Sequence, residues 1–381
     1  MKNRRTLIFV LFILLIVLLS GCKEKKIKIG VLLYSSSDSA LNTIYETFKN
    51  ELDNNYELVV KNAENSQMLQ NDQFLELIDE GCELIIVNLV DRLSASVYVD
   101  KAKKQDIPLI FFNREPIWED LYNYNKAYYV GNDGEAIGLM QAKIVGKMFS
   151  NPNDLSIYYD TNGNNIIEMV ILKGEQGHQI TETIFSTCIN ELHNKEYATS
   201  ILATEYANWN RQNAKEAIRK LYYSDKCRDS RGKSNIEVVI CNNDEMAMGV
   251  IDFIFEEEIY YISKTDGSYI MPFDIIGANI TVSSLAAIES KYLFGSITGE
   301  EAKQGEVIAY LVKSLAKRKT PDLTIYDAAI YESGEHIYKL NKNFIYVNGE
   351  IVYSKRRWFI LFIVFCILLF KICHKNKYLY V

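Results

Sequence analysis

Short apolar runs alternate with longer amphipathic segments along most of this chain. The apolar runs are rich in valine, isoleucine and leucine without strict alternation, which is typical of parallel strands buried on both faces. They cover residues 27–34, 84–88, 109–112, 169–172, 238–241 and 275–277. Segments with helical periodicity lie between them, at 39–52, 94–105, 135–148, 179–192, 210–222 and 244–255. This order predicts repeated β–α–β units, and because the strands are too many for one small sheet, we expect two α/β lobes with parallel sheets.

Several of these strands end in a polar cluster directly before the next helix. The clusters are Ser35-Ser36-Ser37-Asp38, Asn113-Arg114-Glu115-Pro116, Gly174-Glu175-Gln176-Gly177-His178 and Asn242-Asn243-Asp244. In open α/β sheets, ligands bind outside the carboxyl ends of the strands. Acids, amides and an imidazole gathered there suit a small molecule that carries hydroxyl or amino groups. At any single position, capping of the following helix is an equally good explanation.

The N-terminal segment concerns targeting. Lys2, Arg4 and Arg5 precede an apolar run at 6–19, and Leu19-Ser20-Gly21-Cys22 follows. This order is typical of a secretory signal, and the cysteine after Gly21 makes it similar to a bacterial lipoprotein signal. We therefore expect 1–21 to be removed, Cys22 to be lipidated, and the protein to be anchored on the extracytoplasmic face of the cell membrane. The alternative is an uncleaved membrane anchor, although the run is short for a span of about 20 residues.

The C-terminal segment 355–381 is a second apolar and basic stretch. Lys355, Arg356 and Arg357 precede an uncharged run at 358–370, and further lysines follow. The run is short for a membrane-spanning helix of about 20 residues. We expect a membrane-associated tail; a second anchor, an interfacial segment and an extension from a disrupted reading frame stay open as explanations.

Composition narrows the function classes. The 381 residues suggest about two domains, and the net charge of −7 comes without a basic stripe, so no nucleic-acid partner is expected. Four cysteines of the central chain fit no zinc or disulfide pattern and are expected to be buried free thiols: Cys82, Cys188, Cys227 and Cys241. The chain shows no nucleophile motif, phosphate loop or pair of catalytic acids, so we do not expect an enzyme. We also expect a monomer.

Four ordered stretches are similar to the periplasmic galactose/glucose-binding protein family, within the type I periplasmic binding proteins. They are Ile107-Pro108-Leu109-Ile110-Phe111-Phe112-Asn113-Arg114-Glu115-Pro116, Lys126-Ala127-Tyr128-Tyr129-Val130-Gly131, Leu172-Lys173-Gly174-Glu175, and Ile236-Glu237-Val238-Val239-Ile240-Cys241-Asn242-Asn243-Asp244 followed by Met246-Ala247-Met248-Gly249. A looser likeness covers 84–91, and the resemblance as a whole spans 26–317. It implies two α/β lobes with parallel sheets, joined by a three-strand hinge, that close on a sugar.

The same resemblance implies lobe boundaries and ligand residues. The N-terminal lobe is expected at 22–132 plus about 299–330, and the C-terminal lobe at 133–298 plus about 331–354. The positions that match the family's sugar-binding residues are Asp38, Asn113, His178, Trp209 and Asn243, with Asn279 in place of an acid. Carboxylates and amides suit paired hydroxyl groups, and an indole covers the apolar face of a sugar ring. For Trp209 the alternative is a core residue, but its neighbours are polar.

The chain also departs from the family at the expected pocket. Ala40 replaces an aromatic residue, and Ile180 and Ile184 replace an acid and an arginine in the helix after His178. Gly299 aligns with the position, near the last crossover between the lobes, where the family has an asparagine. Each lost charged hydrogen-bonding group costs about 1.5–3 kcal/mol of binding free energy. We therefore expect either a ligand that is less polar at that end or a degenerating site.

Residues 160–168 have the spacing of a calcium-binding loop. Oxygen-bearing side chains alternate along the loop, and a backbone carbonyl completes the pattern; the ligands are Asp160, Asn162, Asn164, Ile166 and Glu168. The resemblance adds Glu237 as the distant sixth ligand. The sixth loop position, usually glycine, is Asn165, which tolerates the left-handed conformation. The sequence predicts a structural Ca²⁺ ion here; a plain Asn/Gly turn is the alternative.

The sequence therefore favours a lipid-anchored, extracytoplasmic solute-binding protein. It would capture a monosaccharide, either galactose/glucose-like or modified, for the permease of an ABC importer. The alternative function is a sugar-sensing module for a chemotaxis or two-component signalling partner in the membrane.

Overall fold

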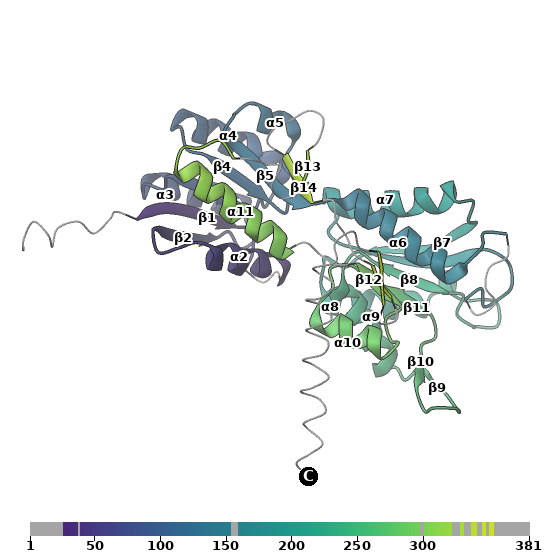
Figure 1. Ribbon diagram of the computed structural model, residues 1–381. Helices are drawn as coiled ribbons and strands as arrows, with labels where there is room; N and C mark the ends of the chain where they lie inside the picture. The colour runs from purple at the N-terminus through teal and green to yellow at the C-terminus, as the bar shows by residue number, and fades with distance from the viewer. Residues whose placement is uncertain are drawn as a thin grey trace, which may run out of the picture. The chain divides into compact units, whose positions relative to one another are not determined.

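The computed structural model describes residues 26–36, 39–153, 159–297, 301–321, 328–330, 337–340, 345–347 and 350–353. The chain divides into two compact units, Met1–Val130 with Ala302–Leu323, and Gly131–Glu301 with Thr324–Val381. The chain therefore passes from one unit to the other three times. Figure 1 shows the elements of each unit with their labels.

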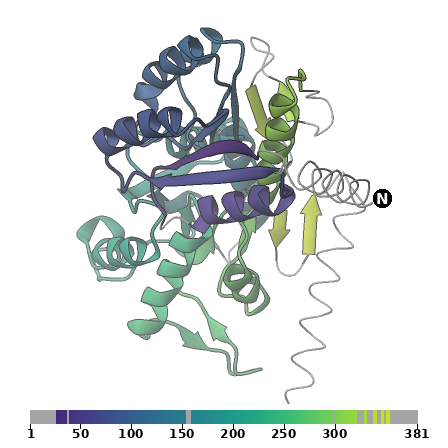
Figure 2. The ribbon, with the colours of Figure 1, turned by 90° about the vertical axis from the view of Figure 1, so that its left-hand side faces the viewer.

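The first unit is built on a sheet with strand order β13-β14-β5-β4-β3-β1-β2. Its parallel strands are β1 (Ile27–Leu33), β2 (Tyr56–Asn62), β3 (Leu84–Val87), β4 (Leu109–Phe112) and β5 (Ala127–Asn132). An antiparallel pair, β13 (Ala328–Ile330) and β14 (Ile337–Leu340), extends the sheet beside β5. Its helices are α2 (Ser39–Glu51), α3 (Gln67–Asp79), η1 (Arg92–Ser94), α4 (Ala95–Lys104), α5 (Trp118–Tyr122) and α11 (Glu301–Ala316). In Figure 2, α2 and α11 can be followed beside the strands of this sheet.

The second unit is built on a sheet with strand order β16-β15-β12-β11-β8-β6-β7. Its parallel strands are β6 (Ile167–Lys173), β7 (Thr199–Tyr206), β8 (Val238–Cys241), β11 (Asp274–Ile276) and β12 (Gly295–Ile297). The antiparallel strands β15 (Ile345–Val347) and β16 (Glu350–Tyr353) complete it. Its helices are α6 (Gly134–Phe149), α7 (Gln179–Asn194), α8 (Arg211–Tyr222), η2 (Asp225–Cys227), α9 (Asp244–Glu256) and α10 (Val282–Glu289). A hairpin of β9 (Tyr261–Ile262) and β10 (Tyr269–Ile270) extends from this unit (Figures 1 and 2).

The second sheet separates two apolar cores. Alternate residues of β6 and β8, such as Leu172 and Cys241, pack with α8 and α9. Their neighbours, such as Ile171 and Ile240, pack with α6 and α7. Burial on both faces explains why these strands read as continuous apolar runs, and the prediction of two α/β lobes with parallel sheets is confirmed. The four central cysteines are buried free thiols, also as predicted.

The chain after Leu323 belongs to one unit by its compactness and to the other by its strand pairing. The division into compact units assigns the chain after Leu323 to the second unit, whereas the order of the strands places β13 and β14 in the first sheet. The predicted boundary at about residue 330 stays a prediction.

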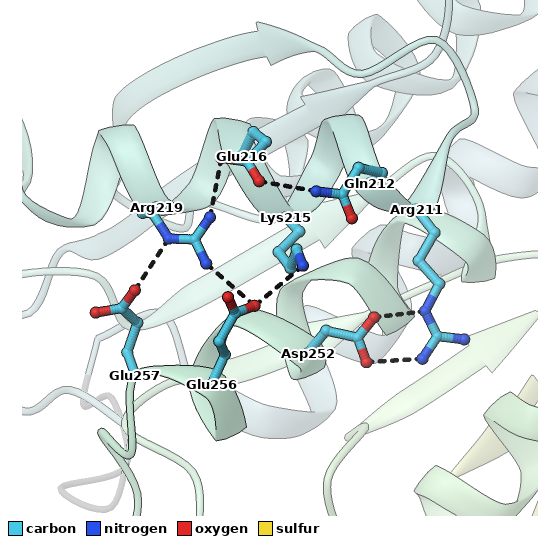
Figure 3. Close-up of polar contacts among 8 residues, drawn as sticks. All are labelled: Arg211, Gln212, Lys215, Glu216, Arg219, Asp252, Glu256 and Glu257. Carbon is cyan, nitrogen blue, oxygen red and sulfur yellow. Dashed lines mark hydrogen bonds and ion pairs between the residues drawn. The ribbon is translucent and has the colours of Figure 1, made fainter.

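Helices α8 and α9 are tied together by a ladder of ion pairs (Figure 3). Arg211 makes two hydrogen bonds to Asp252, at 2.6 and 2.7 Å. Lys215 pairs with Glu256 at 3.0 Å, and Arg219 bridges to the acids at the end of α9. A methyl group on Gly249 would overlap the Arg211 carbonyl, so only glycine allows this close approach of the two helices. The Arg211–Asp252 pair fixes the start of α8, which lies two residues after Trp209.

Among the helices of the described residues, none is long and apolar enough to cross a membrane. The signal at 1–21, Cys22 and the tail at 355–381 lie outside the described residues, as do Asp38 and Gly299.

Candidate functional site

Three predicted ligand residues meet at the carboxyl edge of the second sheet. His178 is the N-cap of α7, Trp209 lies between β7 and α8, and Asn243 is the N-cap of α9. The rings of His178 and Trp209 meet edge to face, with centroids 5.6 Å apart and planes at 77°. The Asn243 side-chain amide donates to the Trp209 carbonyl at 3.3 Å, and its oxygen accepts the Met246 N–H at 3.0 Å. Asn243 therefore both caps a helix and supports Trp209.

The backbone that carries Trp209 is strained. Asn208 and Trp209 both have left-handed φ values, 51° and 58°. A left-handed residue other than glycine costs on the order of 1–3 kcal/mol and persists only where its surroundings hold it. Here the Ala207 N–H donates to the Lys173 carbonyl at 2.8 Å, and the Asn208 N–H donates to the Gly174 carbonyl at 3.1 Å. Such strain is concentrated at functional sites, which supports a binding role for Trp209.

The indole of Trp209 lies directly against Gly174. A methyl group at Gly174 would overlap the six-membered ring of the indole, so no larger residue fits there without a shift. Asn242, which is 2% exposed, accepts the Gly174 N–H on its side-chain oxygen at 3.0 Å. Asn242 thus positions Gly174, the residue against which the Trp209 indole lies. The sequence analysis did not predict this role of Asn242. Asn242 belongs to the polar cluster after β8, but the family resemblance pointed only to its neighbour Asn243.

Asp244 lies beneath the same edge and is fully buried. Its carboxylate accepts a hydrogen bond from the Ser296 hydroxyl of β12 at 2.6 Å, and its N–H donates to the Ala278 carbonyl at 2.7 Å. Burial raises the pKa of this carboxyl to about 7, although hydrogen bonds from Ser284 and Ser296 act against the rise. Asp244 therefore links the end of β8 to β12 through its carboxyl and to the segment after β11 through its backbone N–H.

Asn279 and Asn113 follow strands at corresponding edges of the two sheets. Asn279 follows β11, has φ 67°, and donates its N–H to the Ile297 carbonyl at 2.7 Å. Asn113 follows β4 in the first unit, has φ 61°, and its carbonyl accepts the Tyr129 hydroxyl at 2.9 Å. Beside it, the Arg114 guanidinium stacks on the Tyr34 ring at 4.1 Å. His178, Trp209 and Asn243 are thus brought together within the second unit, while Asn113 belongs to the first.

The two isoleucines that replace charged family residues have different surroundings. Ile184 is 1% exposed and belongs to the core between α6, α7 and the sheet. Ile180 is partly buried and packs against the same core. Ile184 is therefore a core residue, and the expectation that its side chain faces a ligand is corrected.

The loop at 160–168 lies at the opposite, amino-terminal edge of the second sheet, before β6. Both carboxylate oxygens of Asp160 accept loop N–H groups, from Gly163 at 2.8 Å and Asn165 at 2.9 Å. Asn165 has φ 60°, the left-handed conformation expected at the sixth position. The Asn162 and Asn164 amides donate to Glu168 at 2.6 and 3.4 Å, and the Ile166 N–H donates to the Asn164 side chain at 2.8 Å.

Glu237 closes this loop from the start of β8. It is 2% exposed and accepts the N–H groups of Thr161 at 2.6 Å and Glu168 at 3.2 Å. Burial raises the pKa of Glu237 to about 7, and the nearby acids Glu168 and Asp160 add to the rise. Within the described residues, no three His, Cys, Asp or Glu side chains are grouped as a metal site. The set is instead rich in amide and backbone oxygens, which suit Ca²⁺, and a cation would offset the burial of Glu237.

Residues 29–320 match the family model described as "Periplasmic binding protein domain". The D-galactose/methyl-galactoside binding periplasmic protein MglB of Haemophilus influenzae is 30% identical over 296 residues, which cover 77% of this chain and 82% of that protein. A putative rhizopine-binding protein of Rhizobium meliloti is 24% identical, over 71% of this chain and 77% of that protein. Both relatives are named as binding proteins, and the prediction that the chain is not an enzyme is confirmed by this kinship.

Solved structures show the same fold. A galactofuranose binding protein superposes with a TM-score of 0.67 at 16% identity, over 84% of this chain and 95% of that one. A periplasmic solute binding protein from Actinobacillus succinogenes, with bound D-allose, gives a TM-score of 0.65 at 17% identity, over 85% and 98% of the two chains. At these identities the likeness establishes the fold alone, and it confirms the predicted type I fold of two α/β lobes.

Proposed function

Because the chain belongs to the periplasmic binding protein domain family, we propose that it is an extracytoplasmic solute-binding protein that captures a monosaccharide for an ABC importer. The observation that carries this proposal is the edge-to-face pair of His178 and Trp209, supported by Asn243 at the carboxyl edge of the second sheet. The name of the Haemophilus influenzae relative, a D-galactose/methyl-galactoside binding protein, supports a galactose-like ligand.

The geometry suits a sugar. The half-buried indole of Trp209 offers an apolar face for the C–H groups of a pyranose or furanose ring. The imidazole of His178, perpendicular to it, can exchange hydrogen bonds with a hydroxyl at the ring's edge. Because Gly174 lies against the indole and Asn243 holds the Trp209 backbone, little rotamer freedom is lost on binding.

A sugar panel tests this function on the full-length protein. At least one monosaccharide should raise the melting temperature and change the tryptophan emission, and Trp209→Ala should abolish both effects. Tyr261→Ala, at an exposed position of β9, is the matched control and should bind normally. A Trp209→Ala protein that binds as tightly as the wild type would remove Trp209 from the site.

We propose that the preferred sugar carries a substituent or a deoxy carbon where related proteins recognise hydroxyl groups. Ile180 offers no hydrogen bond, and Ile184 lies in the core. Without two charged partners, binding of glucose or galactose should weaken by roughly two to four decades. Calorimetry decides the point: a Kd below about 1 μM for either sugar contradicts this specificity.

The alternative function is a sugar-sensing module for a membrane signalling partner. The isoleucines at 180 and 184 and the apolar tail at 355–381 favour this alternative over a plain importer component. Cross-linking in the native membrane separates the two: capture of a permease supports import, and capture of a chemoreceptor or histidine kinase supports sensing.

The anchoring of the protein is a separate proposal. The order Leu19-Ser20-Gly21-Cys22 supports lipidation of Cys22, and the basic flanks of 358–370 support a membrane-associated tail. Cys22→Ser should leave the precursor uncut by the lipoprotein-specific peptidase. Mass spectrometry of a processed but unlipidated Cys22 in the wild type would contradict the lipid anchor.

A structural Ca²⁺ ion at 160–168 and Glu237 is also proposed. Its supports are the alternating oxygen ligands, the left-handed Asn165 and the buried carboxylate of Glu237. A bound ion would join the loop before β6 to the start of β8.

A further inference from the structure

Lys173 is a buried cation at the carboxyl end of β6, and the sugar contacts proposed above do not account for it. Its side chain is 5% exposed and forms an ion pair with Glu182 of α7. Its Nζ also donates to the Tyr206 hydroxyl, at the end of β7, at 3.3 Å. That hydroxyl donates to the other carboxylate oxygen of Glu182 at 2.8 Å. Lys173, Glu182 and Tyr206 thus form a closed ring of contacts, the Lys173 network, which joins three elements.

The energetics of this network point away from a role in stability alone. Burying an ammonium group is costly unless it is paired. Because the Glu182 side chain is 44% exposed, the ion pair that compensates this cost adds little net stability. Here Lys173 Nζ lies 4.5 Å from the centroid of the Phe185 ring and 4.8 Å from that of Tyr206, which offsets part of the cost. Burial opposes ionisation of Glu182, yet the hydrogen bonds of Lys173 and Tyr206 hold the pKa of its carboxyl below the usual value. The network therefore consists of charged, directional contacts, although a methionine in place of Lys173 would fill the same space.

Both ring-bearing segments of the candidate site start from this network. The Lys173 carbonyl accepts the Ala207 N–H at 2.8 Å, and the next residue, Gly174, lies against the Trp209 indole. On the other side, the Glu182 N–H donates to the His178 carbonyl at 3.3 Å. A shift of α7 relative to β6 would move His178, and a shift of the end of β7 would move Trp209.

We propose that the Lys173 network holds the His178 and Trp209 rings in their edge-to-face contact before a ligand arrives. Lys173, Glu182 and Tyr206 are then positioning residues, since they act through the two rings. The strained backbone at Asn208 and Trp209 requires such external support. A platform that is already ordered costs less to occupy, because fewer side chains lose freedom on binding. The expected effect on affinity rests on the proposed sugar-binding function. The expected effect on the contact between the two rings does not depend on that function.

The first test uses the ligand-free, full-length protein. The near-ultraviolet circular dichroism of Trp209 is obtained by subtracting the spectrum of the matching Trp209→Phe protein in each background. Lys173→Met and Glu182→Gln should each lose most of this band while the far-ultraviolet spectrum stays unchanged. Lys215→Met is the matched control, because it breaks a 3.0 Å ion pair to Glu256 in the same unit (Figure 3) and should keep the band.

The outcomes separate positioning from folding. If Lys173→Met fails to fold, Glu182→Gln and Tyr206→Phe, which keep side-chain size, decide the question. A Trp209 band that survives in every folded variant overturns the proposal, and so does an equal loss in Lys215→Met.

The second test measures the affinity of any sugar that the wild type binds. Lys173→Met and Glu182→Gln should weaken it about tenfold, with no comparable change in Lys215→Met. An undiminished affinity in both network variants overturns the positioning role. If the wild type binds no sugar of the panel but the Trp209 band depends on the network, the proposed function fails and the positioning role stands.

Discussion

Three predicted ligand residues share a left-handed backbone: Asn113, Trp209 and Asn279, with φ values of 61°, 58° and 67°. Each follows a parallel strand at its carboxyl end, where the chain must turn sharply. Asparagine tolerates this conformation, because its side chain can bond to the local backbone. Tryptophan has no such compensation, so its surroundings must hold it, and Gly174 is the residue against which its ring lies.

Replacing Gly174 tests that dependence. Gly174→Ala should displace the indole, because the new methyl group overlaps it. We expect binding of the preferred sugar to weaken by about tenfold or more, which calorimetry measures. Gly146→Ala is the control, because a methyl group there makes only ordinary contact with Tyr197. Equal affinities of the two variants would show that the contact between Gly174 and the Trp209 indole does not matter for binding.

Asp244 makes a prediction about pH. Its folded pKa of about 7 lies above the unfolded value of about 3.9, so folding favours the protonated carboxyl. Its contribution to stability is full below about pH 4 and is lost as the pH rises towards 7, by at most about 4 kcal/mol. Asp244→Asn removes this loss. The stability of the variant relative to that of the wild type should therefore be greater at pH 8 than at pH 5. Urea unfolding at both pH values measures the gain, and a pH-independent difference contradicts it.

At the scale of elements, helices are fixed against each other by close approach and by ion pairs. Gly138 allows α6 to pack on α7, because a methyl group there would overlap the Ile184 carbonyl. Gly249 and the Arg211–Asp252 pair do the same for α8 and α9 (Figure 3). These contacts place the first turns of α7, α8 and α9, where the polar site residues lie.

The burial of Ile184 gives a prediction for α7. Ile184→Arg should lower the free energy of unfolding by about 3–5 kcal/mol, because it places an unpaired charge in the core beside α6. Denaturant titration measures the loss, with Ile180→Arg, at the half-buried position, as the milder control. Wild-type stability together with tighter glucose binding would show that residue 184 reaches the ligand after all.

The loop before β6 gives a prediction about calcium. Ca²⁺ should raise the melting temperature, because an ion that binds only the folded loop stabilises it by mass action. Glu237→Gln should abolish the difference between calcium and chelator, whereas Glu257→Gln, an acid at the end of α9, should preserve it. A melting curve that is unchanged after complete metal removal would leave the loop as a plain turn.

At the scale of the molecule, the chain passes three times between its two units. The resemblance to the sugar-binding family predicts that the two units close on a ligand. We expect a saturating sugar to reduce the radius of gyration of the protein in solution, which small-angle scattering measures. A Trp209→Ala control should show no change, and an unchanged radius in the wild type with proven saturation would contradict closure.

Part of this architecture could be predicted from the sequence. The runs at 109–112 and 238–241 coincide with β4 and β8, because strands buried on both faces must be apolar throughout. The parallel strands β2, β5, β7 and β12 were not predicted. Both β2 and β7 lie at sheet edges and mix exposed with half-buried residues, which leaves no continuous apolar run. The sequence also pointed to His178, Trp209 and Asn243, which the structure brings together, through the polar residues at the strand ends and the family resemblance.

The sequence by itself determined the α/β class, strands such as β4 and β8, and the family resemblance, because the burial period of each of these elements is written locally in its own residues. Only the tertiary structure decided the roles of Gly174, Asn242, Lys173 and Ile184. Lys173 becomes part of a network because Tyr206, 33 residues away, ends the neighbouring strand. Asn242 supports the indole through Gly174, from 68 residues away. Such roles depend on distant partners that meet only when the sheet forms, and no local pattern records them.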